Sequence, residues 1–336
     1  MENYSVDINK FDELLSKAKS VLIVQADNPD ADSLGSSVAL EQLLMLQNKD
    51  TLLYSAVPMP SYLRYVTGWD RVSNILMEKF DLTIFVDVST TTLIKKLILL
   101  NHLEKIQRKP IIVIDHHDTV NQKMDIADLS IVLGQKSSTG QIIYEIAKAN
   151  KYEFNQLFLE SILISILGDT QGLSNQLVTP DTYRLVAEII ELGASRFNID
   201  DRRKEYSSYP VEVYKYKASL INRTEFYNDN EIAILTLNQD DITTFGPLYN
   251  QGPLMHPEIL NIKGIKLSIV IKVYSDGHMT GSIRSNNRYP ISAKLSDYFD
   301  GGGHDYASGF NISSKMNPSE LKKQIVLKAS ELLENI

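Results

Sequence analysis

Acidic side chains and two histidines recur through the first half of the sequence, and each group follows or ends an apolar run. Clustered carboxylates repel one another and are stabilised together by cations. Oxygen ligands combined with one or two imidazoles favour Mn²⁺ or Mg²⁺. These residues therefore predict a divalent-ion site, provided that the fold brings them together. They are Asp30, Asp32, Asp87, Asp115, His116, His117 and Asp169.

The segments around these residues alternate between short β-branched runs and longer periodic stretches. The short runs are typical of buried strands, and they cover 20–26, 51–57, 81–87 and 110–116. Apolar residues at a spacing of three to four predict helices, over 36–47, 90–100, 138–149, 155–167 and 181–193. Such alternation predicts an α/β fold with a doubly wound, mainly parallel sheet. Ligands of such sheets bind at the carboxyl ends of the strands, where three of the acidic groups stand.

The second half of the chain has a different pattern of apolar and polar residues. Residues 194–222 are polar and charged, and we expect them to form a helical linker. Beyond them, strand-like runs cover 231–237, 265–274 and 278–285, and a final helix starts near residue 318. The turn Ser-Asp-Gly between the last two runs predicts a hairpin. We therefore predict a catalytic domain over 1–193, the linker over 194–222, and a smaller α+β domain over 223–336.

Composition narrows the class of protein. The 336 residues are 43% hydrophobic and 23% charged, which is typical of globular domains. The formal net charge of −8 argues against binding to long duplex nucleic acid. There is no cysteine, so any metal must be held by His, Asp or Glu. Neither a secretory signal nor a membrane-spanning run is recognisable, and we expect a cytoplasmic protein without membrane contact.

Each feature taken alone has a simpler explanation. An aspartate at a strand end usually caps a helix or forms a turn, and a histidine pair is commonly exposed at the surface. Three successive strand ends that carry Asp or His are hard to obtain from capping alone. The combination therefore favours a metal site over isolated caps.

The ordered motifs resemble those of the DHH phosphoesterase family. They are NPDADSLGS (28–36), VDVS (86–89), IDHH (114–117) and GDT (168–170). In the second half, GSIRS (281–285) and GGGHDYASG (301–309) resemble the DHH-associated domain that usually follows. The resemblance is greatest to the short oligoribonuclease, pAp-phosphatase and dinucleotide phosphodiesterase group. It implies an Mn²⁺-dependent phosphoesterase, with Mg²⁺ as an alternative ion. The expected substrate is a small nucleotide or short single-stranded oligonucleotide, and the expected assembly is a homodimer.

The resemblance also implies roles for individual residues. One metal ion would be held by Asp30 and Asp87, and a second by Asp32, Asp87, His116 and Asp169. His117 would donate to the scissile phosphate, and Asp115 would orient a histidine. Arg288 is a further candidate phosphate contact. The expected substrate-binding residues are Arg284, Ser285, Gly301, Gly302, Gly303 and His304.

One position departs from the family pattern. The family usually has a histidine two residues before Asn28, as a ligand of the first ion, and this chain has Ala26 there. The flanking Gln25 and Asp27 should point to the other face of the strand. Three interpretations stay open: a weak first site, a one-ion enzyme, or a nucleotide-binding protein that has lost catalysis. A polyphosphate or pyrophosphate hydrolase is a further alternative with the same metal chemistry.

Overall fold

The computed structural model describes residues 2–117, 124–312 and 316–336. The chain divides into two compact units, Met1–Ser208 and Tyr209–Ile336. The division lies within residues 194–222, where α8 (Arg196–Ser207) ends the first unit and α9 (Val211–Arg223) begins the second. The domain limits at 193 and 223 stay predictions. Within the described ranges, no helix is both long and apolar enough to cross a membrane.

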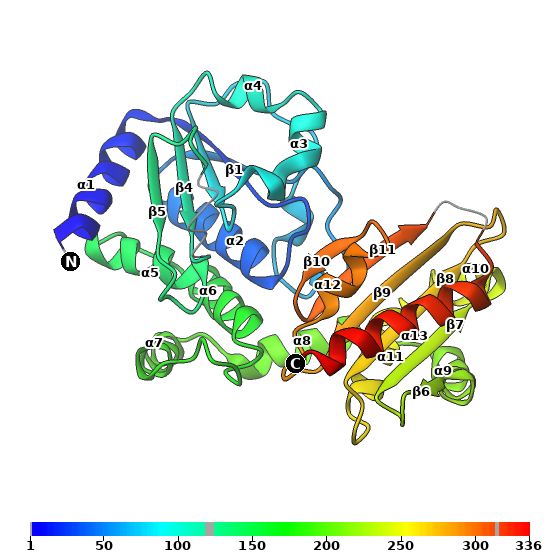
Figure 1. Ribbon diagram of the computed structural model, residues 1–336. Helices are drawn as coiled ribbons and strands as arrows, with labels where there is room; N and C mark the ends of the chain where they lie inside the picture. The colour runs from blue at the N-terminus through cyan, green and yellow to red at the C-terminus, as the bar shows by residue number, and fades with distance from the viewer. Residues whose placement is uncertain (1, 118–123, 313–315) are drawn as a thin grey trace. The chain divides into compact units, whose positions relative to one another are not determined.

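The sheet of the first unit is parallel throughout. Its five strands, counted within the described residues, have the order β2-β1-β3-β4-β5. Strands β1, β4 and β5 are labelled in Figure 1. Strands β3 and β4 are buried along their whole length, as a sheet covered on both faces requires. The short β5 escaped prediction because its four residues include an exposed serine. The strands are β1 (Ser20–Val24), β2 (Asp50–Tyr54), β3 (Leu82–Val86), β4 (Ile111–Asp115) and β5 (Leu129–Val132).

Helices cover both faces of this sheet, which confirms the doubly wound α/β class. Val21 and Ile23 face the cluster that includes α2, α5 and α6, whereas Leu22 and Val24 face the cluster that includes α3 and α4. The helices on the first face are α1 (Glu2–Lys17), α2 (Ala31–Leu46), α5 (Thr139–Ala149), α6 (Gln156–Asp169) and α7 (Pro180–Glu191). Those on the second face are α3 (Lys95–Leu99) and α4 (Leu103–Ile106). Short 3₁₀ helices in the described part of this unit lie at Ser61–Leu63, Trp69–Arg71 and Thr91–Ile94.

Two predicted helix boundaries in the first unit were wrong. Helix α2 begins at Ala31 rather than at residue 36, because the Asp30 carboxylate accepts a hydrogen bond from the Ser33 amide and caps it. Asp32 therefore lies in the first helical turn and not in a loop. The predicted helix 90–100 is a 3₁₀ turn followed by the five residues of α3.

The second unit has a mixed sheet, which confirms its α+β class. Its order is β10-β11-β9-β8-β7-β6 for the strands that the structure describes. Strands β7 and β8 are parallel, and the other neighbours are antiparallel, including the predicted β8–β9 hairpin. The strands are β6 (Glu225–Tyr227), β7 (Ile232–Leu237), β8 (Leu267–Val273), β9 (Met279–Ser285), β10 (Gly302–His304) and β11 (Ala307–Ile312).

Helices also pack on both faces of the mixed sheet (Figure 1). One face carries α12 (Ser292–Asp297) and α13 (Pro318–Glu334). The other carries α9 and α11 (Gln251–Leu260), and α10 (Gln239–Phe245) follows β7. Helix α11 packs over Ala233, Leu235 and Val270 of β7 and β8. The face of β9 and β11 beyond it carries small or polar residues.

Candidate metal centre and phosphate-binding residues

The predicted acidic residues of the first unit lie at the carboxyl ends of β1, β3 and β4. The strand order changes direction between β1 and β3, and ligands of such sheets bind at this switch point. Helices α2 and α5 begin at the same edge, and α6 ends with Asp169. Within the described residues, two groups of side chains could each hold an ion: Asp32, His116 and Asp169, and Asp87, Asp115, His116 and His117.

Asp32 is completely buried and is held by donors from three helices. The amide of Thr139, in the first turn of α5, donates to Asp32 Oδ2 at 2.8 Å, and the hydroxyls of Ser36 and Ser165 donate to Oδ1 at 2.7 and 2.5 Å. The amide of Gly140 approaches Oδ1 at 3.4 Å, and a Cβ at Gly140 would lie 2.2 Å from Ser165 Oγ. Only glycine therefore lets the start of α5 come this close. These donors fix the carboxylate and leave Oδ2 facing His116.

His116 is oriented by the protein backbone so that one ring nitrogen faces the acids. Its Nδ1 lies 3.2 Å from the carbonyl oxygen of Lys136, which can only accept, so Nδ1 carries the proton of that contact. Its Nε2 lies 2.6 Å from Asp169 Oδ2 and 3.5 Å from Asp32 Oδ2. A backbone carbonyl on the far nitrogen is the usual way to fix a metal-binding imidazole. Nε2 is thus the nitrogen available to an ion.

Asp87 stands directly after β3 with an unusual backbone. Its φ is +61°, in the left-handed region that non-glycine residues rarely adopt, and such strain is concentrated at functional sites. The side chain is buried and accepts a hydrogen bond from Thr139 Oγ1 at 3.1 Å. The same threonine residue donates its amide to Asp32, so the N-terminus of α5 holds both carboxylates.

Asp115 orients His117 rather than His116. Its Oδ1 accepts from the amide of His117 at 2.9 Å and contacts His117 Nδ1 at 2.8 Å, and Asp87 Oδ1 lies 3.4 Å from the same nitrogen. These hydrogen bonds raise the pKa of His117 to about 11. About half of the His117 side chain is exposed, so an imidazolium is presented at the rim of the site.

The pKa shifts show a site crowded with negative charge. Burial and the charge of Asp32 raise the pKa of Asp87 well above its usual range, and the same two causes raise the pKa of Asp169 to about 6. A bound cation would relieve this repulsion. The donor set of Asp32, His116 and Asp169, with Asp87 nearby, therefore fits a hard divalent ion such as Mn²⁺ or Mg²⁺.

The residues expected around the first ion fit less well. Asp30 caps α2, is exposed, and belongs to neither candidate group among the described residues. Ala26 offers no ligand atom and is packed in the apolar cluster beneath α3. Asp27 accepts from the Lys96 amide at 2.6 Å, so it helps to start α3 instead of replacing the imidazole. Gln25 is buried, and its side-chain amide has no hydrogen-bond partner among the described residues.

Restoring the family's imidazole should therefore strengthen ion binding. We expect Ala26→His to lower the Kd for Mn²⁺ by at least about tenfold, since even indirect partners of metal ligands contribute that much. Isothermal calorimetry should also show more ions bound per chain. Ala26→Leu, which adds bulk without a ligand atom, is the matched control. Unchanged affinity in the histidine variant would mean that a neighbour already compensates for the missing ligand.

Ion binding should also depend on pH through His116. Burial lowers the pKa of His116, but the hydrogen bond to Asp169 and the charges of Asp32 and Asp169 outweigh it and raise the pKa to about 9. At neutral pH the ion must therefore displace a proton. We expect the Kd for Mn²⁺ to fall by up to about tenfold per pH unit between about pH 6 and pH 8. Calorimetry in buffers of different ionisation enthalpy should detect the released proton, and a Kd independent of pH would contradict this assignment.

The second unit holds the predicted substrate-binding residues. Arg284 is half-buried on β9 and has no carboxylate partner among the described residues, and burial lowers its pKa. Ser285 is buried, donates to the Asp305 carbonyl at 3.1 Å and contacts Ser292 Oγ at 3.1 Å. A Cβ at Gly301 would lie 2.3 Å from the Gly309 carbonyl oxygen, whereas one at Gly302 would meet nothing within 4 Å. Gly303 has a φ of +141°. The side chain of His304 lies outside the described residues.

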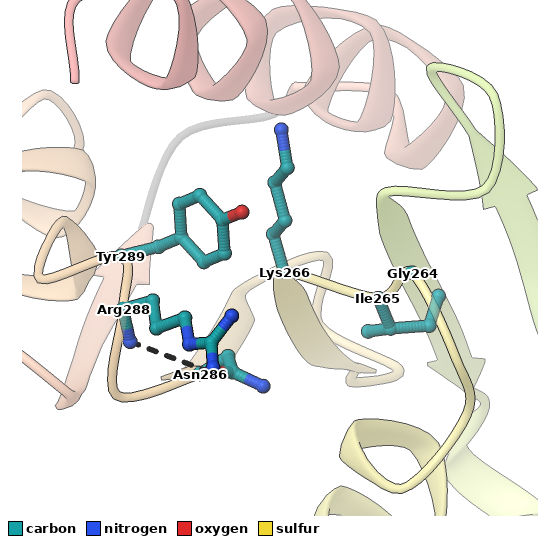
Figure 2. A pocket seen from close by; sticks show the side chains of 6 residues that line it. All are labelled: Gly264, Ile265, Lys266, Asn286, Arg288 and Tyr289. Carbon is teal, nitrogen blue, oxygen red and sulfur yellow. Dashed lines mark hydrogen bonds between the residues drawn. The ribbon is translucent and has the colours of Figure 1, made fainter.

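Arg288 lies in a different place from Arg284. It borders a polar cavity of about 440 Å³, whose lining does not include Arg284 (Figure 2). In that cavity Lys266 is paired with Glu231 and stands 4.9 Å over the ring of Tyr289. The amide of Arg288 donates to the Asn286 side chain at 3.3 Å. The role of Arg288 as a phosphate contact therefore stays a prediction.

Several residues that build the site were not predicted from sequence. Ser36, Ser165 and Thr139 hold the acids, and the Lys136 carbonyl orients His116. The helix cap at Ser138 was the available signal, because it places the amides of Thr139 and Gly140 at a helix N-terminus. A serine inside an apolar helix such as α6 gives no comparable signal.

Comparison with known proteins finds a family similarity for part of the first unit. Residues 20–167 match the DHH family, N-terminal domain. The first unit therefore contains a DHH-family domain, as the motifs predicted.

Individual relatives match over nearly the whole chain. An uncharacterised protein of Mycoplasma genitalium is 26% identical over 94% of this chain and 91% of its own length. A probable bifunctional oligoribonuclease and PAP phosphatase of Streptococcus mutans is 24% identical over 94% of this chain and 97% of its own. A crystal structure of an exopolyphosphatase-related protein from Bacteroides fragilis has a TM-score of 0.82 at 21% identity, covering 98% of both chains. The last similarity establishes a shared fold.

Proposed function

We propose that this protein is a divalent-ion-dependent phosphodiesterase that hydrolyses short nucleotides, such as linear dinucleotides, RNA of a few residues, or pAp. The observation that carries the proposal is the convergence of Asp32, His116 and Asp169 beside Asp87, with an imidazolium at the rim. The DHH-family match and the Streptococcus mutans relative, named for oligoribonuclease and PAP phosphatase activities, support this reaction class.

The residues of the first unit would have different roles in the reaction. Asp32, Asp87, His116 and Asp169 would hold the ion, which supplies a nucleophile at neutral pH by lowering the pKa of water and stabilises negative charge on phosphoryl oxygens. Asp115 holds His117 protonated, so that Nε2 can donate to a phosphate oxygen or to the leaving group. At the N-terminus of α5, the amide of Thr139 keeps Asp32 in place and its hydroxyl keeps Asp87 in place.

The second unit would bind the substrate. The half-buried guanidinium of Arg284, which has no carboxylate partner among the described residues, matches a phosphate, to which arginine can donate two parallel hydrogen bonds. Gly302 leaves open space in front of its backbone, where a nucleotide can approach closely. Manganese as the resident ion, a homodimer and a cytoplasmic location remain parts of this proposal.

A substrate panel tests the reaction. The purified chain with Mn²⁺ should hydrolyse 5′-pApA to AMP, or another linear dinucleotide to its mononucleotides, and chromatography should detect the products. The panel also includes pAp, a cyclic dinucleotide and polyphosphate. Hydrolysis of any of the nucleotides supports the proposal and ranks the substrates. Phosphate release from polyphosphate alone would favour the polyphosphatase alternative, and an inert panel would overturn the proposal.

A second candidate is a nucleotide-binding protein with weakened catalysis. Ala26 and the position of Asp30 outside both ligand groups favour it. Calorimetry distinguishes the two: tight binding of pApA without product would support the binding protein, whereas turnover would exclude it.

A further inference from the structure

A buried histidine in the second unit links two strands through their serines. His256 of α11 is 5% exposed. Its Nδ1 lies 2.8 Å from Ser268 Oγ on β8, and its Nε2 lies 2.9 Å from Ser282 Oγ on β9. Burial, with the nearby charge of Arg284, lowers the pKa of His256 to about 3, so the ring is neutral.

A neutral ring donates through one nitrogen and accepts through the other. Ser268 is completely buried, and its hydroxyl forms a hydrogen bond with His256 and with no other side chain or carbonyl among the described residues. If Nδ1 carried the proton, the buried Ser268 hydroxyl would have no acceptor, which is costly. The satisfied arrangement is therefore Ser268 donating to Nδ1, with Nε2–H donating to Ser282 Oγ.

This arrangement leaves the Ser282 proton without an acceptor among the described residues. Ser282 is partly exposed, and alternation along β9 places it on the same sheet face as Arg284. On that face Gly309 lies opposite Ser282, and Gly302 lies opposite Gly309. The Ser282 hydroxyl thus borders two glycines in a row on this face, and the residue opposite Arg284 is the small Ala307. By contrast, Ser285 points to the other face and its hydroxyl is used internally.

We propose that Ser282 and Arg284 together bind a phosphate group of the substrate, and that His256, fixed by Ser268, positions the Ser282 proton toward it. This inference rests on the proposed function, because it specifies how the nucleotide is held. Arg284 supplies charge and Ser282 a directed donor, a pair that suits the oxygens of a phosphate. His256 acts through Ser282 and does not contact the ligand.

Binding of AMP, measured by calorimetry on the full chain, tests the contact. Ser282→Ala should raise the Kd for AMP and the KM for pApA by about tenfold to a hundredfold, as expected for a hydrogen bond to a charged group, with kcat nearly unchanged. His256→Leu should have the same effect, whereas His256→Gln, which keeps a donor and an acceptor, should restore part of the binding. Thr280→Ala, two residues along the same face of β9, is the matched control.

The ring proton gives an independent readout. Long-range ¹⁵N–¹H spectra should show His256 protonated at Nε2 and not at Nδ1. A proton on Nδ1, or wild-type affinity in Ser282→Ala while the wild type hydrolyses pApA, would overturn this inference and leave the proposed function intact. A wild type that neither binds AMP nor hydrolyses any nucleotide would overturn both.

Discussion

Replacing Asp87 by alanine should abolish turnover, with kcat falling by more than about 10³-fold. The carboxylate belongs to one candidate ligand group, where it contacts His117, and it shares Thr139 with Asp32 of the other group. The family resemblance assigns it to both ions. Its loss would remove a ligand and also an acceptor that holds His117. The measurement is the rate of pApA hydrolysis at saturating Mn²⁺.

Stability measurements show whether the loss of activity on replacing Asp87 comes from the site alone or from unfolding. Because burial and Asp32 raise the pKa of Asp87, its ionised form destabilises the ion-free fold at neutral pH. We therefore expect ion-free Asp87→Asn to melt at the same temperature as the wild type or higher. Mn²⁺ should raise the Tm of the wild type more than that of the variant. Asp201→Asn, an exposed aspartate on α8, is the matched control and should retain activity. Retained turnover in Asp87→Ala would rule out the bridging role.

His117→Asn should lower kcat by about 10²- to 10⁴-fold, the usual contribution of a positioned acid or base. The structure holds His117 as an imidazolium through Asp115 and Asp87, with about half of its side chain exposed. His117 belongs to the second candidate group and not to the Asp32–His116–Asp169 group. Because we assign the ion to Asp32, His116 and Asp169, the Kd for Mn²⁺ should change much less than kcat. Steady-state kinetics and calorimetry on the same preparation separate the two effects.

The chain offers a close control for this histidine. His278 repeats the local arrangement in the β8–β9 turn, where its amide and Nδ1 contact Asp276 Oδ1 at 3.1 and 2.6 Å. His278→Asn removes an equivalent histidine–aspartate pair outside the site and should leave kcat unchanged. Equal losses in both variants would show that the effect of His117 is structural, and a fall in Mn²⁺ affinity matching that in kcat would make His117 a ligand.

Sequence reasoning located the acidic residues because strand ends in a parallel sheet must meet at one edge. Asp32, Asp87 and His116 follow strands and lie where that rule places them, whereas Asp169 is brought to the same edge by the end of helix α6. It could not find the donors that fix them, because Ser36 and Ser165 are unremarkable residues within apolar helices. The positive φ of Asp87 is likewise invisible, since it depends on how the chain leaves β3.

In the second unit, prediction from sequence was limited by different features of the chain. Strands β10 and β11 are rich in glycine and lack the β-branched pattern that predicts strands. Once their pairing is known, alternation along β9 separates Ser282, on the face of Arg284, from the buried Ser285. Both serines belong to the GSIRS motif, and Ser285 was the one predicted to bind substrate, whereas register and the hydrogen bonds of His256 favour Ser282.

The most direct test is hydrolysis of 5′-pApA by metal-free protein before and after addition of Mn²⁺. The account predicts no product without the ion, AMP after its addition, loss of product on chelation, and no recovery in Asp87→Ala. Hydrolysis that is equally fast without any divalent ion, or that survives in Asp87→Ala, would contradict the assignment of this cluster as the catalytic centre.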